Sequence, residues 1–227
     1  MKQLSLQEIK DILVGCTILG TGGGGSLEKG LESVTKEWEA GHKFNLMAFD
    51  EMLEDLKLLP QQVEFLLSNR SKIQKFANRY IGAKSIFFIG RGIDYAISLE
   101  GSLKLKEISY IHSEAYAAGE LKHGTISLIE EGTLVACVAT QEHLYKKTIS
   151  NMVEVKARGA FVLAVTNEGN YDMEKEADYV IYIPKTNPYF ANTLAIIPLQ
   201  LFGYYVAVGK GCDVDKPRNL AKSVTVE

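Results

Sequence analysis

The spacing of apolar side chains predicts helices in the first third of the chain. Residues 5–18 carry apolar side chains on one face, and Ser5 followed by Glu8 has the spacing of a capping box. A second helix is predicted from Ser26, as its N-cap, to a stop at Gly41. A third helical region covers about 50–80. The chain therefore begins with a helical N-terminal segment.

The pattern changes near residue 84, where short apolar runs alternate with helical patterns. The runs are residues 85–89, 133–139, 160–165 and 179–183. The helical patterns are residues 94–110, 143–158, 170–177 and 189–209. Strands that alternate with helices form parallel sheets with crossover connections. From residue 84 onward the sequence predicts a three-layer α/β domain with a parallel sheet of four or five strands, and ligands in such sheets bind at the carboxyl ends of the strands.

The composition is typical of a folded cytoplasmic protein. Of 227 residues 46% are hydrophobic, and the net charge of −3 gives no reason to expect nucleic acid as a partner. No apolar run approaches about 18 residues and the N-terminus lacks an apolar core, so we expect neither a membrane span nor a signal peptide. Cys16, Cys137 and Cys212 lie far apart without a CxxC spacing, which predicts reduced thiols. No cofactor and no metal site are predicted.

A charged stripe lies on the predicted helix 94–110, within the segment EGSLKLKE. Glu100, Lys104 and Glu107 are spaced i, i+4 and i+7, so the three share one helix face. The plain interpretation is a solvated stripe of helix-stabilising ion pairs. The alternative is catalytic, because this helix starts at a strand end, where α/β sites lie. A partly covered carboxylate beside a lysine can shuttle protons.

Two further residues are candidates for chemistry. His123 lies in AAGELKHGTI, a glycine-bracketed turn that can present an imidazole to a ligand, although such a histidine is more often a structural turn residue. Lys222 lies in the tail segment NLAKSVTVE, where a lysine is ordinarily solvated. The neighbouring apolar residues allow the tail to pack back, and a desolvated amine can form a Schiff base with a ketone.

The segment LGTGGGGS, residues 19–26, raises the question of a phosphate site. Bare backbone N–H groups at a helix start can bind phosphate, so Gly22, Gly23, Gly24, Gly25 and Ser26 are candidate substrate-binding residues. A capped helix precedes the run, however, whereas dinucleotide and P-loop glycines follow a strand. A flexible connector between two helices is the other interpretation.

Two long stretches carry a family resemblance. The segments IGRGIDYAISLEGSLKLKEISYIHSEAYAAGELKHG and CDVDKPRNLAKSVTVE resemble the C-terminal isomerase part of glucosamine-6-phosphate synthase (glutamine–fructose-6-phosphate aminotransferase). The likeness runs from about residue 54 to residue 227. It implies the second of that family's two tandem sugar-isomerase (SIS) domains, together with the preceding helix and the C-terminal tail.

The resemblance implies a role for each matching residue. Lys222 matches the tail lysine that forms an imine with the C2 ketone of fructose 6-phosphate, and Ala221 beside it matches a substrate-binding position. Glu107 matches the glutamate that moves a proton between C1 and C2, and Lys104 matches the lysine beside it. His123 matches the ring-opening histidine, which in the family comes from the neighbouring subunit. A homodimer that binds fructose 6-phosphate or glucosamine 6-phosphate is therefore implied.

The sequence also departs from that family. The chain starts Met-Lys-Gln, without the cysteine nucleophile of the glutaminase domain, and the first isomerase domain with its phosphate-binding loop is not recognised. TQEHLYKKT, which follows the predicted strand 133–139, lacks the Ser-x-Ser-Gly character of such a loop. Residues 1–52 resemble instead the start of an uncharacterised family found beside hydantoinases and oxoprolinases. We therefore expect a helical segment of different origin over 1–52 and a SIS domain over 53–227.

Three hypotheses about function follow. The first is a phosphosugar isomerase-type domain that works through a lysine imine. The second is a non-catalytic module that binds a phosphosugar or regulates another protein. The third is an inactive fusion fragment. A fold with suitable acid–base residues does not fix a reaction, because contacts to the phosphate normally supply much of the binding energy.

Overall fold

The computed structural model describes residues 2–19, 26–46 and 49–218. The chain divides into two compact units between Lys57 and Leu58. Helix α3 (Phe49–Ser68) runs without interruption through this boundary and through the predicted one at residue 52, and it accommodates Pro60 in its interior. Each unit is described separately below.

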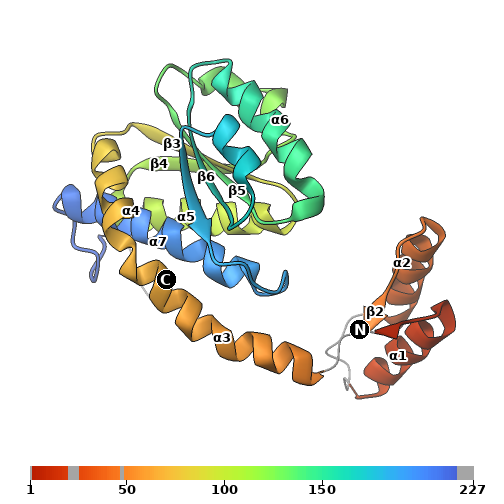
Figure 1. The fold of residues 1–227 in the computed structure, drawn as a ribbon. Coiled ribbons are helices and arrows are strands. Elements are labelled where there is room, and N and C mark those ends of the chain that lie inside the picture. The colour runs from red at the N-terminus through yellow and green to blue at the C-terminus, as the bar shows by residue number, and fades with distance from the viewer. Residues whose placement is uncertain (1, 20–25, 47–48, 219–227) are drawn as a thin grey trace, which may run out of the picture. The chain divides into compact units, whose positions relative to one another are not determined.

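The N-terminal unit combines two helices with a short antiparallel sheet of two strands (Figure 1). Its elements are β1 (Lys2–Gln3), α1 (Leu6–Leu19), α2 (Leu27–Glu39) and β2 (Asn45–Leu46). The predicted capping box is confirmed, because Ser5 N–H donates to Glu8 Oε2 at 2.8 Å and Glu8 N–H donates to Ser5 Oγ at 3.3 Å. The ion pair with Lys2, together with the bonds to Ser5, lowers the pKa of Glu8 to about 2.

A parallel five-stranded sheet forms the centre of the second unit, as the sequence predicts. Its strand order is β4-β3-β5-β6-β7, and every neighbouring pair is parallel. The bounds are β3 (Ser85–Gly90), β4 (His112–Ala117), β5 (Leu134–Ala139), β6 (Phe161–Asn167) and β7 (Tyr179–Ile183). The apolar runs predicted four of these strands. The fifth, β4, reads HSEAYA and is an edge strand without an apolar run.

Helices cover both faces of the sheet (Figure 1). The helices of this unit are the C-terminal part of α3, α4 (Arg70–Ala77), α5 (Ile93–Ser109), α6 (Tyr145–Lys156) and α7 (Ala191–Gly209). Ile86 and Phe88 of β3 point into the core under α4, α5 and α7, whereas Phe87 and Ile89 point into the core under α6. This alternation produces the three predicted layers.

Helices α5 and α7 pack closely and run in the same direction. A Cβ on Gly101 would lie 2.7 Å from the Leu199 side chain, and a Cβ on Gly203 would lie 3.6 Å from the Leu105 backbone. Because the facing positions increase together along both helices, the helices are parallel. Their C-terminal ends therefore lie at the same end of the domain, next to the amino ends of the strands.

Some sequence expectations need correction. The helix predicted over 170–177 is the 3-10 turn Tyr171–Lys175. Other 3-10 turns are Asn78–Tyr80, Leu121–His123, Thr125–Leu128 and Glu142–Leu144. The expectation that no apolar stretch approaches membrane-spanning length is wrong for α7, which is long and apolar enough by length and composition. Half of that window is buried, and the helix packs on the sheet as the core helix of a globular domain does.

Candidate functional site

The predicted charged stripe of α5 is present as an ion-paired group. Lys104 Nζ donates to Glu107 Oε2 at 2.7 Å and lies 3.6 Å from Glu100 Oε1. The Lys104 and Glu107 side chains are 35% and 24% exposed, so the pair is partly covered but remains within reach of a ligand. The prediction that the three side chains share one face is therefore confirmed.

The contact with Glu107 stabilises the charged form of Lys104. The hydrogen bond to Glu107 raises the pKa of Lys104, and the charges of Glu107 and Glu100 act in the same direction. Lys104 is therefore an ammonium group at neutral pH. An ammonium group cannot attack a ketone, so the contact with Glu107 disfavours Lys104 as the imine-forming amine.

The position of the pair corrects the expectation that it lies near the carboxyl ends of the strands. Helix α5 starts close to the carboxyl end of β3, but Glu107 lies in its last turn, fourteen residues after Ile93. At 1.5 Å per residue this is about 21 Å along the helix. Glu107 therefore lies at the amino edge of the sheet, close to where His112 begins β4.

His123 follows β4 in the chain, whereas the helix that carries Glu107 precedes β4. The strand runs from the amino edge to the carboxyl edge of the sheet, and His123 ends a 3-10 turn six residues after Ala117. Its side chain is 64% exposed and lies 3.8 Å from Glu120. In the part of the chain that the structure describes, no hydrogen bond or ion pair joins His123 to Lys104 or Glu107. The structure does not bring these predicted partners together within one chain.

The carboxyl edge of the sheet is occupied by a carboxylate of the chain itself. Asp94, which is 2% exposed, accepts hydrogen bonds from Thr140 N–H at 2.8 Å and from Thr140 Oγ1 at 2.5 Å. Thr140 is the first residue after β5, at the position where a phosphate-binding loop would lie, and Asp94 occupies both of its donors. Gln141 Nε2 donates to the Arg91 carbonyl at 2.7 Å and closes the turn from the other side. The expectation that TQEHLYKKT forms no phosphate loop agrees with this geometry.

Asp94 was not among the predicted functional residues. Its signal in the sequence is an acidic residue in the first turn of a helix that follows the glycine turn Gly90-Arg91-Gly92. The turn is tight, because a Cβ on Gly90 would lie 2.4 Å from the Asp94 backbone. Gly92 has φ 55°, a conformation that favours glycine. The turn therefore brings Asp94 directly over the end of β5.

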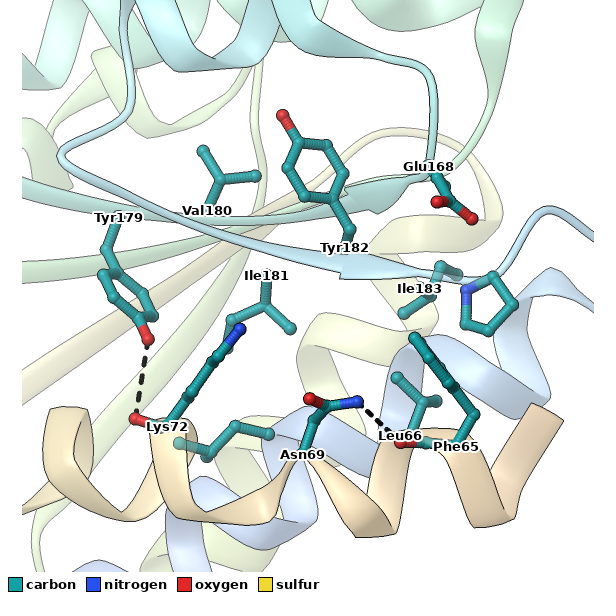
Figure 2. Close-up of a pocket in the computed structure, with 12 residues that line it drawn as sticks. Phe65, Leu66, Asn69, Lys72, Glu168, Tyr179, Val180, Ile181, Tyr182 and Ile183 are labelled. Carbon is teal, nitrogen blue, oxygen red and sulfur yellow. Dashed lines mark hydrogen bonds between the residues drawn. The ribbon is translucent and has the colours of Figure 1, made fainter.

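Two cavities lie away from the acid–base pair. One borders the carboxyl edge and is lined by Thr140, Asn167 and Asn192, among others. Figure 2 shows the other, between β7 and the junction of α3 and α4, where Tyr179 Oη donates to the Lys72 carbonyl at 3.5 Å. Neither cavity is lined by a predicted catalytic residue. Over the described ranges, no three His, Cys, Asp or Glu side chains group as metal ligands would.

The remaining candidates lie mostly outside the described residues. These are Ala221, Lys222 and the four glycines Gly22, Gly23, Gly24 and Gly25. Ser26 is described, and its Oγ accepts from Lys29 N–H at 3.4 Å as the N-cap of α2. This hydroxyl therefore has a structural role as a helix cap.

Comparisons with known proteins identify the family of the second unit. The family model for the SIS domain matches residues 79–209, over the whole of the parallel sheet. The chain belongs to the SIS domain family. The model for the S-Me-THD-like N-terminal domain matches residues 7–63. The SIS fold explains the parallel sheet with helices on both faces, and the second match covers most of the N-terminal unit and continues along α3.

Curated proteins similar to the SIS domain share one name, glutamine–fructose-6-phosphate aminotransferase [isomerizing]. The glutamine–fructose-6-phosphate aminotransferases [isomerizing] of Caldanaerobacter subterraneus subsp. tengcongensis and Clostridium tetani are 60% and 57% identical over 78% and 81% of this chain. The chain spans 29% and 30% of their lengths. The predicted resemblance to this family is therefore confirmed.

Solved structures agree with this assignment. The C-terminal domain of glucosamine-fructose-6-phosphate aminotransferase from Francisella tularensis is 36% identical, with a TM-score of 0.69 over 73% of this chain and 47% of that chain. Glucosamine-6-phosphate deaminase from Thermotoga maritima is 25% identical, with a TM-score of 0.56 over 84% of this chain and 53% of that chain. This SIS domain thus matches about half of each of these structures.

Proposed function

We propose that the chain supplies the proton-transfer groups for aldose–ketose isomerisation of a sugar phosphate, either fructose 6-phosphate or glucosamine 6-phosphate. The observation that carries the proposal is the partly covered Lys104–Glu107 pair, in which Lys104 Nζ donates to Glu107 Oε2 at 2.7 Å. An ionised carboxylate that is shielded from bulk water is a suitable general base for a C–H bond made acidic by a neighbouring imine. The printed names of the relatives support the same substrate class.

Lys222 is the proposed imine-forming amine. Its amine adds to the C2 ketone, water leaves, and the resulting C=N bond acidifies the C–H bond at C1. Ammonia then replaces Lys222 on C2, which frees the lysine and leaves a C=N bond at C2; Glu107 accepts the C1 proton and returns it at C2, which gives the 2-amino aldose. The raised pKa of Lys104 supports this division of roles, because it leaves Lys104 as an electrostatic partner of Glu107 and not as the nucleophile.

His123 is proposed to act from a second copy of the chain. Glu107 lies at the amino edge of the sheet, whereas the turn that carries His123 follows the carboxyl end of β4. The length of β4, six residues at about 3.3 Å each, separates these edges by about 20 Å. A single chain with this arrangement does not combine the two groups, which supports a homodimer with sites at the interface.

The phosphate is proposed to be held by groups outside the carboxyl edge of this domain. Asp94 already uses both donors of Thr140, so a phosphate at that position would meet a buried negative charge instead of free N–H groups. The curated relatives are more than three times longer than the matched region. We infer that a neighbouring domain or subunit contributes the phosphate contacts.

A reducing, cytoplasmic location is proposed. Cys16 is an exposed free thiol and Cys137 is a buried one. Burial raises the pKa of Cys137, so this thiol remains protonated and unreactive. Free thiols of this kind are usual where disulfides are kept reduced.

The test combines binding with turnover. Titration calorimetry with fructose 6-phosphate and glucosamine 6-phosphate measures binding, and NMR follows isomerisation and exchange of the C1 hydrogen with solvent deuterium. Isomerisation that disappears in Lys222→Ala supports the imine, whereas unchanged turnover in Lys222→Ala contradicts it. Binding without any exchange would instead favour the second hypothesis, a phosphosugar-binding module without turnover.

A further inference from the structure

Arg91 supplies the side chain of the glycine turn Gly90-Arg91-Gly92, which joins β3 to α5. Its backbone carbonyl accepts hydrogen bonds from Asp94 N–H at 3.1 Å and from Gln141 Nε2 at 2.7 Å. Its side chain is partly buried, and Nε donates to Asn151 Oδ1 of α6 at 2.9 Å. Both the backbone and the guanidinium group of Arg91 are therefore held by hydrogen bonds.

The partner of the guanidinium group, Asn151, is itself fixed within α6. Asn151 is 5% exposed, and its Nδ2 donates to Glu154 Oε2 at 3.0 Å. Because the donor and the acceptor of this buried amide are both used, its orientation is defined. Arg91 thus meets a preorganised acceptor. A lysine in its place would keep the positive charge but lose the planar guanidinium group.

The Arg91 guanidinium group lies against Gly119, in the turn that follows β4. A Cβ on Gly119 would lie 2.8 Å from Arg91 Nη2 and 3.4 Å from Arg91 Cζ. A glycine at this position leaves room for the guanidinium group to approach the backbone. Ala118 N–H also donates to the Gly90 carbonyl at 2.8 Å, so the two turns are joined through the backbone as well.

The turn after β4 carries His123, four residues beyond Gly119. Within the turn Glu120 N–H donates to the Ala117 carbonyl at 2.8 Å, and His123 N–H donates to the Glu120 carbonyl at 3.0 Å. Leu121 is 1% exposed and packs into the core under α6. The His123 side chain, in contrast, is 64% exposed. Since most of the imidazole is in solvent, its direction depends on the backbone that carries it.

We propose that Arg91 is a positioning residue for ring opening of the sugar phosphate: by holding the turn at Gly119, it keeps His123 in the orientation that serves the site of the partner chain. The proposal rests on the proposed function, in which His123 acts from a second copy of the chain. Ring opening of fructose 6-phosphate breaks the bond between C2 and O5, while the hydroxyl on C2 loses a proton and O5 gains one. An imidazole makes these transfers only within hydrogen-bond reach, so a small displacement of the turn is costly.

Four variants of the full chain test the contact from both sides. Arg91→Lys removes the guanidinium group, whereas Gly119→Ala keeps it and places a methyl group 2.8 Å from Nη2. Arg79→Lys is the matched control, because Arg79 precedes β3 at the opposite edge of the sheet and its Cζ lies 4.7 Å from the centre of the Phe161 ring. His123→Ala gives the full effect of losing the imidazole. Circular dichroism checks that each variant folds.

The first readout is the backbone order of residues 119–123, measured by nitrogen-15 NMR relaxation. In the parent chain we expect order parameters of about 0.85, as for rigid backbone. In Arg91→Lys and Gly119→Ala we expect them to fall below about 0.6, because the turn loses its contact with the guanidinium group. Arg79→Lys should match the parent. A turn that stays rigid in both variants overturns the proposal.

The second readout compares two substrates by the exchange of the C1 hydrogen with solvent deuterium. Fructose 6-phosphate must open its ring, whereas 5-deoxyfructose 6-phosphate has no O5 and stays open. For fructose 6-phosphate we expect kcat/KM to fall about tenfold in Arg91→Lys and Gly119→Ala, the equivalent of one hydrogen bond to a charged group. His123→Ala should lower it about 100-fold. With the 5-deoxy compound every variant should lie within about twofold of the parent.

The two readouts separate the positioning role from the proposed function. An equal loss on both substrates would show that Arg91 stabilises the domain as a whole, which overturns the positioning role. Exchange of the 5-deoxy compound alone by the parent chain overturns ring opening by His123 and the role of Arg91 with it. Exchange of neither substrate by the parent overturns the proposed function, while the order parameters still decide whether Arg91 holds the turn.

Discussion

Lys104 and Glu107 are one turn apart on α5, and the lysine donates to the glutamate at 2.7 Å next to the amino edge of the sheet. The opposite edge is where ligands of parallel α/β sheets ordinarily bind. In this domain that edge carries the buried Asp94–Thr140 contact instead. The groups proposed for proton transfer are therefore at the end of the domain where α5 and α7 both finish.

Replacing Glu107 by glutamine should abolish proton transfer while keeping the shape of the side chain. We expect isomerisation to fall by at least about 100-fold, because general acid–base catalysis contributes on this order. Imine trapping at Lys222 should persist, since the glutamine removes the base and not the amine. NMR detection of solvent deuterium at C1 measures the effect directly.

Glu100→Gln is the matched control for that variant. Glu100 lies on the same face but is 3.6 Å from Lys104 and 40% exposed, so we expect activity within about twofold of the parent chain. An equal loss in both variants would mean that the whole charged stripe stabilises α5 and that Glu107 has no special role.

A mixture of two inactive variants should regain activity if His123 acts across a dimer interface. Glu107→Gln and His123→Ala each inactivate both sites of a homodimer. In a mixed dimer one site combines the intact Glu107 of one chain with the intact His123 of the other. Random reassortment should restore about a quarter of the parent activity. A mixture as inactive as its components, with exchange verified by mass spectrometry, would rule out the shared site.

The Glu8 carboxyl of the N-terminal unit should titrate at about pH 2, because Lys2 and Ser5 bind its ionised form. This value is below the 4.5 expected for a glutamate without these partners. A lowered pKa stabilises the folded unit above pH 4.5, and that stabilisation disappears as the pH falls through 2. NMR titration of the Glu8 carboxyl carbon measures the midpoint. Lys2→Met should move it upward, and an unchanged midpoint would contradict the ion pair.

The parallel contact of α5 and α7 predicts opposite outcomes for two glycines. Gly101→Ala places a methyl group 2.7 Å from Leu199 Cδ1 and 3.2 Å from its Cβ, so overpacking should destabilise the domain by about 1 kcal/mol. Gly203→Ala places its methyl group 3.6 Å from Leu105 and should stabilise the domain by up to about 1 kcal/mol, through helix propensity. Urea unfolding compares the two free energies. A loss of stability in Gly203→Ala would show that the helices lie closer than described.

The sequence predicts the architecture of the SIS domain well, since buried parallel strands are continuous apolar runs. It misses β4, because HSEAYA alternates polar and small residues at a sheet edge, where burial is incomplete. The spacing of Lys104 and Glu107 predicts their contact, because helix geometry is local. The spacing does not predict where the pair lies, since that depends on the full length of α5. Asp94 was missed because its partner Thr140 is 46 residues away in the chain.

In the Asp94–Thr140 contact, the Asp94 carboxylate competes with any free anion for the two Thr140 donors. Because Asp94 is covalently part of the chain, its effective concentration at the Thr140 donors does not depend on the surroundings, whereas any free anion competes at its cellular concentration. A free anion at the Thr140 donors would therefore have to displace Asp94.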